Sequence, residues 1–177
     1  MGVAVALLLL GLVACDSRRV DPLEEFASAS CAAIQSWIDA VEDESVRLSR
    51  AVTPLEDASD RVPHYRDFTK AIDLRTWDTV RQLKRIAPAT GAGAVAGREI
   101  VAAMERARGV TQQLIELAGT FPEDDDDPES LTSRISSLFI RLEKAFAHPN
   151  AARDELAERY EAFVDVPACA DYVNPVS

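Results

Sequence analysis

Residues 21–55 read DPLEEFASASCAAIQSWIDAVEDESVRLSRAVTPL, and this stretch decides the fold class. Its apolar residues recur at spacings of three and four, which is the pattern of an amphipathic helix with one buried face. They are Phe26, Ile34, Trp37, Ile38, Val41, Leu48, Val52 and Leu55. The segment begins at Asp21-Pro22 and meets a second proline at Thr53-Pro54, and a helix seldom continues through such a residue. The stretch therefore predicts one long helix that ends near Thr53.

The same helical spacing returns in four later segments of the chain. The second helix is predicted to begin around residues 61–63 and to end before Pro88, and the third to run from the turn at 90–93 to Pro122. The fourth is predicted to run from Pro128 to the His148-Pro149-Asn150 segment, and a shorter fifth helix to cover Leu156 to Val164. No strand-like alternation interrupts them, and short loops favour antiparallel neighbours. The sequence predicts an all-α fold: an up-and-down antiparallel helical bundle of four main helices plus a shorter C-terminal helix.

The charge of the chain disfavours one class of partner. The 177 residues carry a net charge of −11. Nucleic-acid binding needs a basic surface that neutralises phosphates, so nucleic acid is not an expected partner. The charge is nevertheless uneven, because residues 61–108 hold ten Lys or Arg against five Asp or Glu. We expect one side of the domain to be basic.

The N-terminus carries an export pattern. Residues 3–13 form an unbroken apolar run of eleven. A membrane-spanning helix needs about 20 residues, so the run is typical of a signal peptide. Directly after it, Leu12-Val13-Ala14-Cys15 resembles the lipobox of bacterial lipoproteins.

The lipobox resemblance implies a processing route and a location. Residues 1–14 would be a signal peptide that is removed, and Cys15 would receive a diacylglyceryl group and further acyl chains such as palmitate. Residues 15–22 would form a lipidated N-terminus and short tether. Residues 23–177 would form one helical domain at the extracytoplasmic face of the cell membrane, held by its lipid anchor. Two or more acyl chains give stable anchoring, whereas one gives only marginal binding.

The two other cysteines have two interpretations. With Cys15 lipidated, Cys31 and Cys169 remain as a pair in an oxidising compartment, where disulfides persist. Their disulfide would tie the start of the first helix to the C-terminus. The alternative is two separate buried thiols.

Catalytic and metal-binding patterns are weak in this sequence. It has no G-x-S-x-G motif of a hydrolase nucleophile, no ligand spacing for a zinc or di-iron site and no C-x-x-C-H motif for haem attachment. Its histidines, His64 and His148, each lie beside a proline near a predicted helix end. The acidic run at residues 123–127 lacks the spacing of a calcium loop, and a solvated linker in which Asp127 caps the next helix explains it better. We expect no enzyme activity, no cofactor and no metal site.

The second predicted helix carries the most specific surface pattern. On a helical wheel, Trp77 lies opposite the apolar stripe, among four cationic side chains. The five residues of this candidate interaction surface are Arg66, Lys70, Trp77, Arg81 and Lys84. An exposed tryptophan among cations is typical of a surface that meets anionic headgroups or an acidic partner. In the alternative, Leu74 and Trp77 pack under the fifth helix, and the cations cover the ring and pair with acidic groups.

Together these features predict a membrane-anchored extracytoplasmic lipoprotein that acts as a non-enzymatic interaction module of the cell envelope. Its expected partners are the membrane, through Cys15, and an envelope protein or anionic surface. The alternative is a carrier or sensor that binds a small molecule or lipid in a cavity between the helices.

Overall fold

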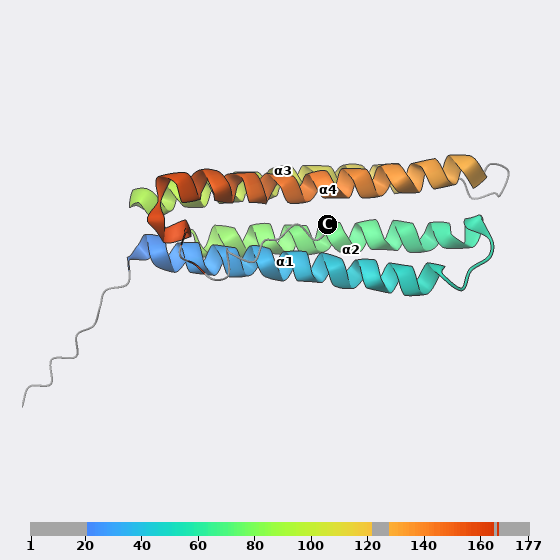
Figure 1. Ribbon diagram of the computed structural model, residues 1–177, viewed down its shortest axis with the longest axis horizontal. Helices are drawn as coiled ribbons and strands as arrows, with labels where there is room; N and C mark the ends of the chain where they lie inside the picture. Colours follow the sequence, from blue (N-terminus) through green and yellow to red (C-terminus); the bar gives the residue numbers. More distant parts are fainter. Residues whose placement is uncertain (1–20, 122–127, 165, 167–177) are drawn as a thin grey trace, which may run out of the picture.

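The computed structural model describes residues 21–121, 128–164 and 166, which form an up-and-down helical bundle. Its helices are α1 (Pro22–Val52), α2 (Ala58–Ile86), α3 (Gly91–Gly119), α4 (Pro128–Arg159) and a short 3-10 helix, η1 (Glu161–Phe163). Helices α1 and α2 form one layer, and α3 and α4 form the other (Figure 1). Each long helix packs antiparallel to the next one in the chain, and no strand occurs among the described residues. The predicted all-α bundle is confirmed.

The ends of α1 follow the local chemistry of the chain. The Asp21 carboxylate accepts a hydrogen bond of 2.8 Å from the backbone N–H of Leu23, which satisfies a donor that the first turn leaves without a partner. Pro22 occupies the start of the helix, where its missing N–H costs nothing. The helix ends at Val52, immediately before Thr53-Pro54. The predicted bounds of this helix are confirmed.

Two other boundaries differ from the prediction by a few residues. Helix α2 begins at Ala58, so Pro63 lies inside the helix rather than in its first turn. Helix α3 begins at Gly91, within the segment predicted as a turn. The φ angle of Gly91 is +72°, a conformation that glycine adopts without a Cβ clash. The link between α2 and α3 is therefore shorter than expected.

The predicted break at His148-Pro149-Asn150 is wrong. Helix α4 is continuous from Pro128 to Arg159, and Pro149 lies inside it. Leu142 and Leu156 are both buried, so the same apolar face continues on either side of the proline. Packing of that face outweighs the one hydrogen bond that proline removes. Among the described residues, α4 leads only into the single 3-10 turn η1, in place of the expected fifth helix.

Trp37 lies in the core, and its side chain is almost fully buried. Its indole N–H donates a hydrogen bond of 2.9 Å to the Thr76 hydroxyl. That hydroxyl donates in turn to the Ile72 carbonyl at 2.8 Å. The Trp37 ring also lies 4.9 Å from the ring of Phe146. One buried side chain thus joins α1, α2 and α4, with its polar atom satisfied.

Small residues bring α3 close to its neighbours at one end of the bundle. Gly93 and Gly97 lie on the buried face of α3. A Cβ atom at Gly97 would lie 2.9 Å from the Cβ of Ala87, and one at Gly93 would lie 2.8 Å from Pro88 Cγ. Carbon atoms in contact normally lie about 3.5 to 4.0 Å apart. These positions therefore have room for glycine alone.

Long apolar helices suited to membrane crossing are not found in the part of the chain that the structure describes. The four helices are amphipathic, each with one face in the bundle core.

Candidate interaction surface on α2

The five predicted surface residues lie on α2, and the structure gives them different surroundings. Lys70, Arg81 and Lys84 are exposed, Trp77 is half-buried, and Arg66 is partly buried. Leu74 lies between them and is 57% exposed. We call the exposed residues Lys70, Leu74, Arg81 and Lys84, together with Trp77, the α2 outer face.

Arg66 does not belong to this surface, because it turns toward the end of α3. Its Nε donates to the carbonyl of Ala118 at 3.2 Å, and its Nη2 donates to the carbonyl of Phe121 at 3.2 Å. Arg134 of α4 donates to the Thr120 carbonyl at 3.0 Å. Two guanidinium groups thus satisfy carbonyls at a helix C-terminus, where the helix dipole favours positive charge. The helical wheel could not reveal this role, since the carbonyls belong to another helix.

Trp77 packs against α3, which neither sequence interpretation anticipates. The guanidinium of Arg108 lies over its ring, 4.2 Å from the ring centre. Asp73 holds this arrangement, because it accepts a hydrogen bond of 2.8 Å from Thr111 and lies 3.8 Å from Arg108 Nε. The alternative interpretation, in which Leu74 packs under a fifth helix, is wrong. Leu74 is exposed, and Trp77 shows one face of its ring to α3.

The cations of the α2 outer face have weak partners, apart from Lys84. Lys84 pairs with Glu105 of α3 at 2.6 Å. Lys70 lies 3.6 Å from Asp67, and Arg81 lies 3.8 Å from Asp78. Exposed pairs of this kind contribute roughly 0 to 1 kcal/mol. Lys70 and Arg81 can therefore exchange these partners for an external anion at little cost.

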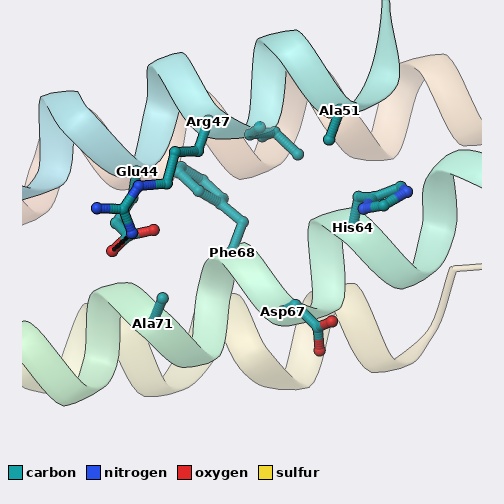
Figure 2. A pocket seen from close by; sticks show the side chains of 8 residues that line it. Glu44, Arg47, Ala51, His64, Asp67, Phe68 and Ala71 are labelled. Carbon is teal, nitrogen blue, oxygen red and sulfur yellow. Dashed lines mark hydrogen bonds and ion pairs between the residues drawn. The ribbon is translucent and has the colours of Figure 1, made fainter. Parts of the chain in front are cut away.

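A groove between α1 and α2 is a second surface feature, and sequence reasoning missed it (Figure 2). It has a volume of about 220 Å³. Apolar side chains, including Leu48 and Phe68, line it, together with Glu44, Arg47, His64 and Asp67. The charged groups in the lining are both positive and negative, so the groove favours neither an anionic nor a cationic ligand.

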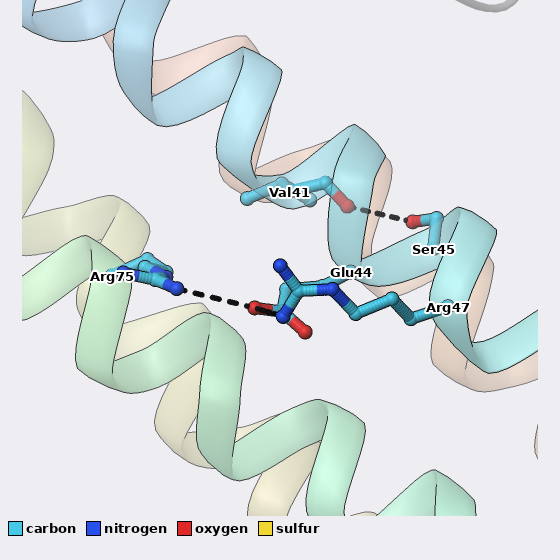
Figure 3. A network of polar contacts seen from close by, with 5 residues as sticks. All are labelled: Val41, Glu44, Ser45, Arg47 and Arg75. Carbon is cyan, nitrogen blue, oxygen red and sulfur yellow. Dashed lines mark hydrogen bonds and ion pairs between the residues drawn. The ribbon is translucent and has the colours of Figure 1, made fainter.

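Glu44 links the two walls of this groove (Figure 3). Its carboxylate lies 3.0 Å from Arg47 on α1 and 3.4 Å from Arg75 on α2. The carboxylate is largely buried, whereas both guanidinium groups are exposed. Two arginines thus neutralise one buried charge, and the arrangement is a cross-link between helices.

The pKa values of two groups elsewhere in the bundle are shifted by their immediate surroundings. Burial and the nearby Arg106 lower the pKa of His148. A hydrogen bond from Arg159 lowers the pKa of Glu99. No cluster of three or more His, Cys, Asp or Glu side chains suited to a metal ion occurs within the described segments.

The remaining predicted residues lie partly outside the described ranges. Cys15, Cys169 and the acidic run at 123–127 fall there, so the proposed lipid site, the disulfide and the linker stay predictions. Cys31 is described and is buried in α1. The ring of Phe163 in η1 lies 6.5 Å from that of Phe26 in α1. The chain therefore returns to the first turns of α1 a few residues before Cys169.

Comparison of the chain with protein-family models, with curated proteins and with solved structures gives no match.

Proposed function

We propose that the protein is a lipid-anchored lipoprotein at the extracytoplasmic face of the cell membrane, and that its bundle is a non-enzymatic interaction module. The α2 outer face is its working surface, and the phosphate groups of an anionic bilayer are the partner. The observation that carries the proposal is the exposure of Leu74, at 57%, between the weakly paired cations Lys70 and Arg81. An apolar side chain flanked by cations fits the boundary between headgroups and acyl chains.

The lipobox at Leu12-Val13-Ala14-Cys15 supports a position close to the bilayer. Six residues, 16–21, lie between the proposed anchor at Cys15 and Pro22, the first residue of α1. A flexible segment of that length reaches roughly 15 Å. The groove formed by Pro22, Phe26 and Ile86 shows that the tethered end of α1 adjoins the C-terminal end of α2. An anchor on Cys15 would hold the α2 outer face within reach of the headgroups.

The carrier alternative needs an internal cavity, and the core offers little support for one. Large apolar side chains from all four long helices are fully buried there, including Trp37, Ile72, Ile100, Met104 and Leu138. The grooves that the structure describes lie along helix seams and at the bundle ends. These features favour a module that binds through its exterior.

The anchor and the surface are tested separately. Wild-type protein should incorporate a labelled fatty acid in cells, and Cys15→Ala should not. The absence of label from the wild type would contradict the anchor. This experiment says nothing about α2, so its failure leaves the surface to be judged by its own test.

The surface is tested by chemical labelling of lysine, because the chain has only three lysines, namely Lys70, Lys84 and Lys144. Lys70 lies on the α2 outer face, whereas Lys144 is exposed on α4 and serves as an internal control. The lipidated protein is reconstituted in phosphatidylcholine vesicles with or without phosphatidylglycerol, and acylation of each amine is followed by mass spectrometry. We expect phosphatidylglycerol to slow labelling of Lys70 relative to Lys144, and added salt to reverse the effect.

An unchanged labelling ratio in all three conditions would refute bilayer docking. Protection of Lys70 in cells but not on vesicles would assign the face to an acidic protein instead. Replacing Arg81 by Glu should weaken the protection of Lys70, whereas the same change at the exposed Arg141 on α4 tests for a general charge effect.

A further inference from the structure

Helices α1 and α4 meet along a wide seam, which we call the α1–α4 seam. Among the described helices, the backbone of α4 runs close to that of α3 but hardly approaches that of α1. Large side chains bridge the gap instead, and the ring of Trp37 on α1 lies 4.9 Å from that of Phe146 on α4. The two helices run antiparallel, and each rises about 1.5 Å per residue. A residue before Trp37 therefore lies level with the residue equally far after Phe146.

One side of α1 faces this seam and η1. Glu24, Cys31 and Gln35 share that side, because they follow one another at spacings of seven and four residues. Glu24 forms a groove of about 470 Å³ with η1 and Val166, the last described residue. Further along the same side, Cys31 is buried, and the side-chain oxygen of Gln35 is buried without a hydrogen-bond partner among the described residues. A buried carbonyl oxygen is normally bonded, so this oxygen can accept a bond from a further donor.

Arg153 lies on the opposite wall of the seam. It follows Phe146 by seven residues and therefore shares its side of α4. Cys31 precedes Trp37 by six residues, so it lies nearly level with Arg153. Arg153 Nε donates to Asp154 at 3.0 Å, and its side chain is only 19% exposed, whereas that of Asp154 is 64% exposed. A guanidinium carries five N–H donors, so Arg153 can bind a second carboxylate inside the seam.

We propose that residues 167–177 occupy the α1–α4 seam as an extended segment of this same chain. The position of Val166 fixes where the segment enters, beside Glu24. From Glu24 to Cys31, α1 rises roughly 10 Å, and three extended residues span at most about 10 Å. Cys169 therefore reaches the level of Cys31. The placement does not depend on the predicted disulfide between them.

The composition of the segment matches the seam. Asp171 is its only charged side chain, and two residues after Cys169 it lies within reach of the long Arg153 side chain, which attracts it. Tyr172 follows and can bury apolar area against the seam. An extended backbone has N–H groups that can donate to the Gln35 oxygen. Because η1 already holds the start of the segment against α1, its local concentration at the seam exceeds that of an external ligand.

Photo-crosslinking tests this placement in the full chain. The photoreactive amino acid p-benzoylphenylalanine replaces Tyr172, and Cys169→Ser removes the predicted disulfide. Trypsin then separates the α1 peptide, residues 20–47, from the C-terminal peptide, residues 160–177, for mass spectrometry. We expect an adduct of these two peptides within one chain. The matched control carries the probe at Leu74, which is 57% exposed on α2, and it should give no adduct with residues 160–177.

Charge reversal tests the proposed ion pair. Arg153→Glu should lower the yield of the adduct about fivefold, because repulsion of Asp171 replaces attraction. The same change at the exposed Arg141 on α4 should leave the yield unchanged. Asp171→Asn changes no residue of the four helices, so it should lower the yield while circular dichroism shows the helices intact. This variant separates loss of docking from loss of folding.

Four results would overturn the proposal. They are no adduct from position 172, adducts that lie mainly on α2 or α3, an adduct of twice the chain mass, and an adduct whose yield survives Arg153→Glu. None of them bears on lysine labelling of the α2 outer face.

Discussion

Gly97 gives the sharpest test of the packing between α2 and α3. A Cβ at this position would lie 2.9 Å from the Cβ of Ala87 and 3.5 Å from its Cα. These atoms cannot rotate away, because they belong to the backbone or are fixed directly to it. The contact is short by about 0.6 Å or more, and overpacking of this kind costs typically 1 to 3 kcal/mol. Helix propensity favours alanine by about 1 kcal/mol, which offsets only part of that cost.

Gly109 supplies the control, because it lies inside the same helix and a Cβ there would meet nothing within 4 Å. The propensity gain should act alone there, so Gly109→Ala should stabilise the protein by about 0.5 to 1 kcal/mol. Helix propensity cancels in the comparison of the two variants. We expect Gly97→Ala to be less stable than Gly109→Ala by about 1 to 3 kcal/mol.

Urea denaturation followed by helical circular dichroism measures both unfolding free energies. The two variants expose nearly the same surface area on unfolding, so the slopes of unfolding free energy against urea concentration should agree. The urea concentrations at the midpoints should differ. Equal stability, or a more stable Gly97→Ala, would refute the close approach of α3 to the end of α2.

Three further predictions concern other parts of the bundle. The pKa of His148 lies below its ordinary value of 6.5 because the imidazole is partly buried. The unfolded state therefore binds more protons, and the free energy of unfolding should fall as pH drops below about 6.5. His148→Gln should reduce this dependence of stability on pH in thermal melts from pH 7.5 to 5. Arg66→Met removes two hydrogen bonds to carbonyls at the end of α3 and should cost about 1 to 2 kcal/mol in urea denaturation, whereas Arg141→Met on the exposed side of α4 should change little. A disulfide between Cys31 and Cys169 should block thiol alkylation in the urea-unfolded protein until reductant is added, and reduction should lower stability by a few kcal/mol. Alkylation of both cysteines in urea without reductant would contradict the pairing.

The bundle could be predicted from the sequence because its helix signals are local. Asp21-Pro22 and Thr53-Pro54 bracket one helix, and the structure begins and ends α1 within a residue or two of them. Pro149 misled the same reasoning. The sequence shows the local cost of a proline inside a helix. It does not show that Leu142 and Leu156, on either side of this proline, are both buried in the core, and this tertiary packing outweighs the local cost.

The surface on α2 could be predicted only in part. Spacing places Lys70, Trp77 and Arg81 on one side of a helix, but it cannot tell what a neighbouring helix offers them. Arg108 over Trp77 and the carbonyls near Arg66 come from α3, whose rotation relative to α2 depends on how both helices pack. Leu74 shows the same limit, because no single-helix pattern decides whether a neighbour covers it.

The two tryptophans give the protein two distinct optical signals. The indole of Trp37 is buried with its N–H bonded to Thr76, so its fluorescence should be blue-shifted and inaccessible to iodide. Trp77 is half-buried beneath the guanidinium of Arg108, so its emission should lie to the red and be open to quenching. Loss of the Arg108 contact at the seam between α2 and α3 would change the second signal alone, whereas global unfolding would change both. Intrinsic fluorescence can therefore follow a local opening of this seam without any added label.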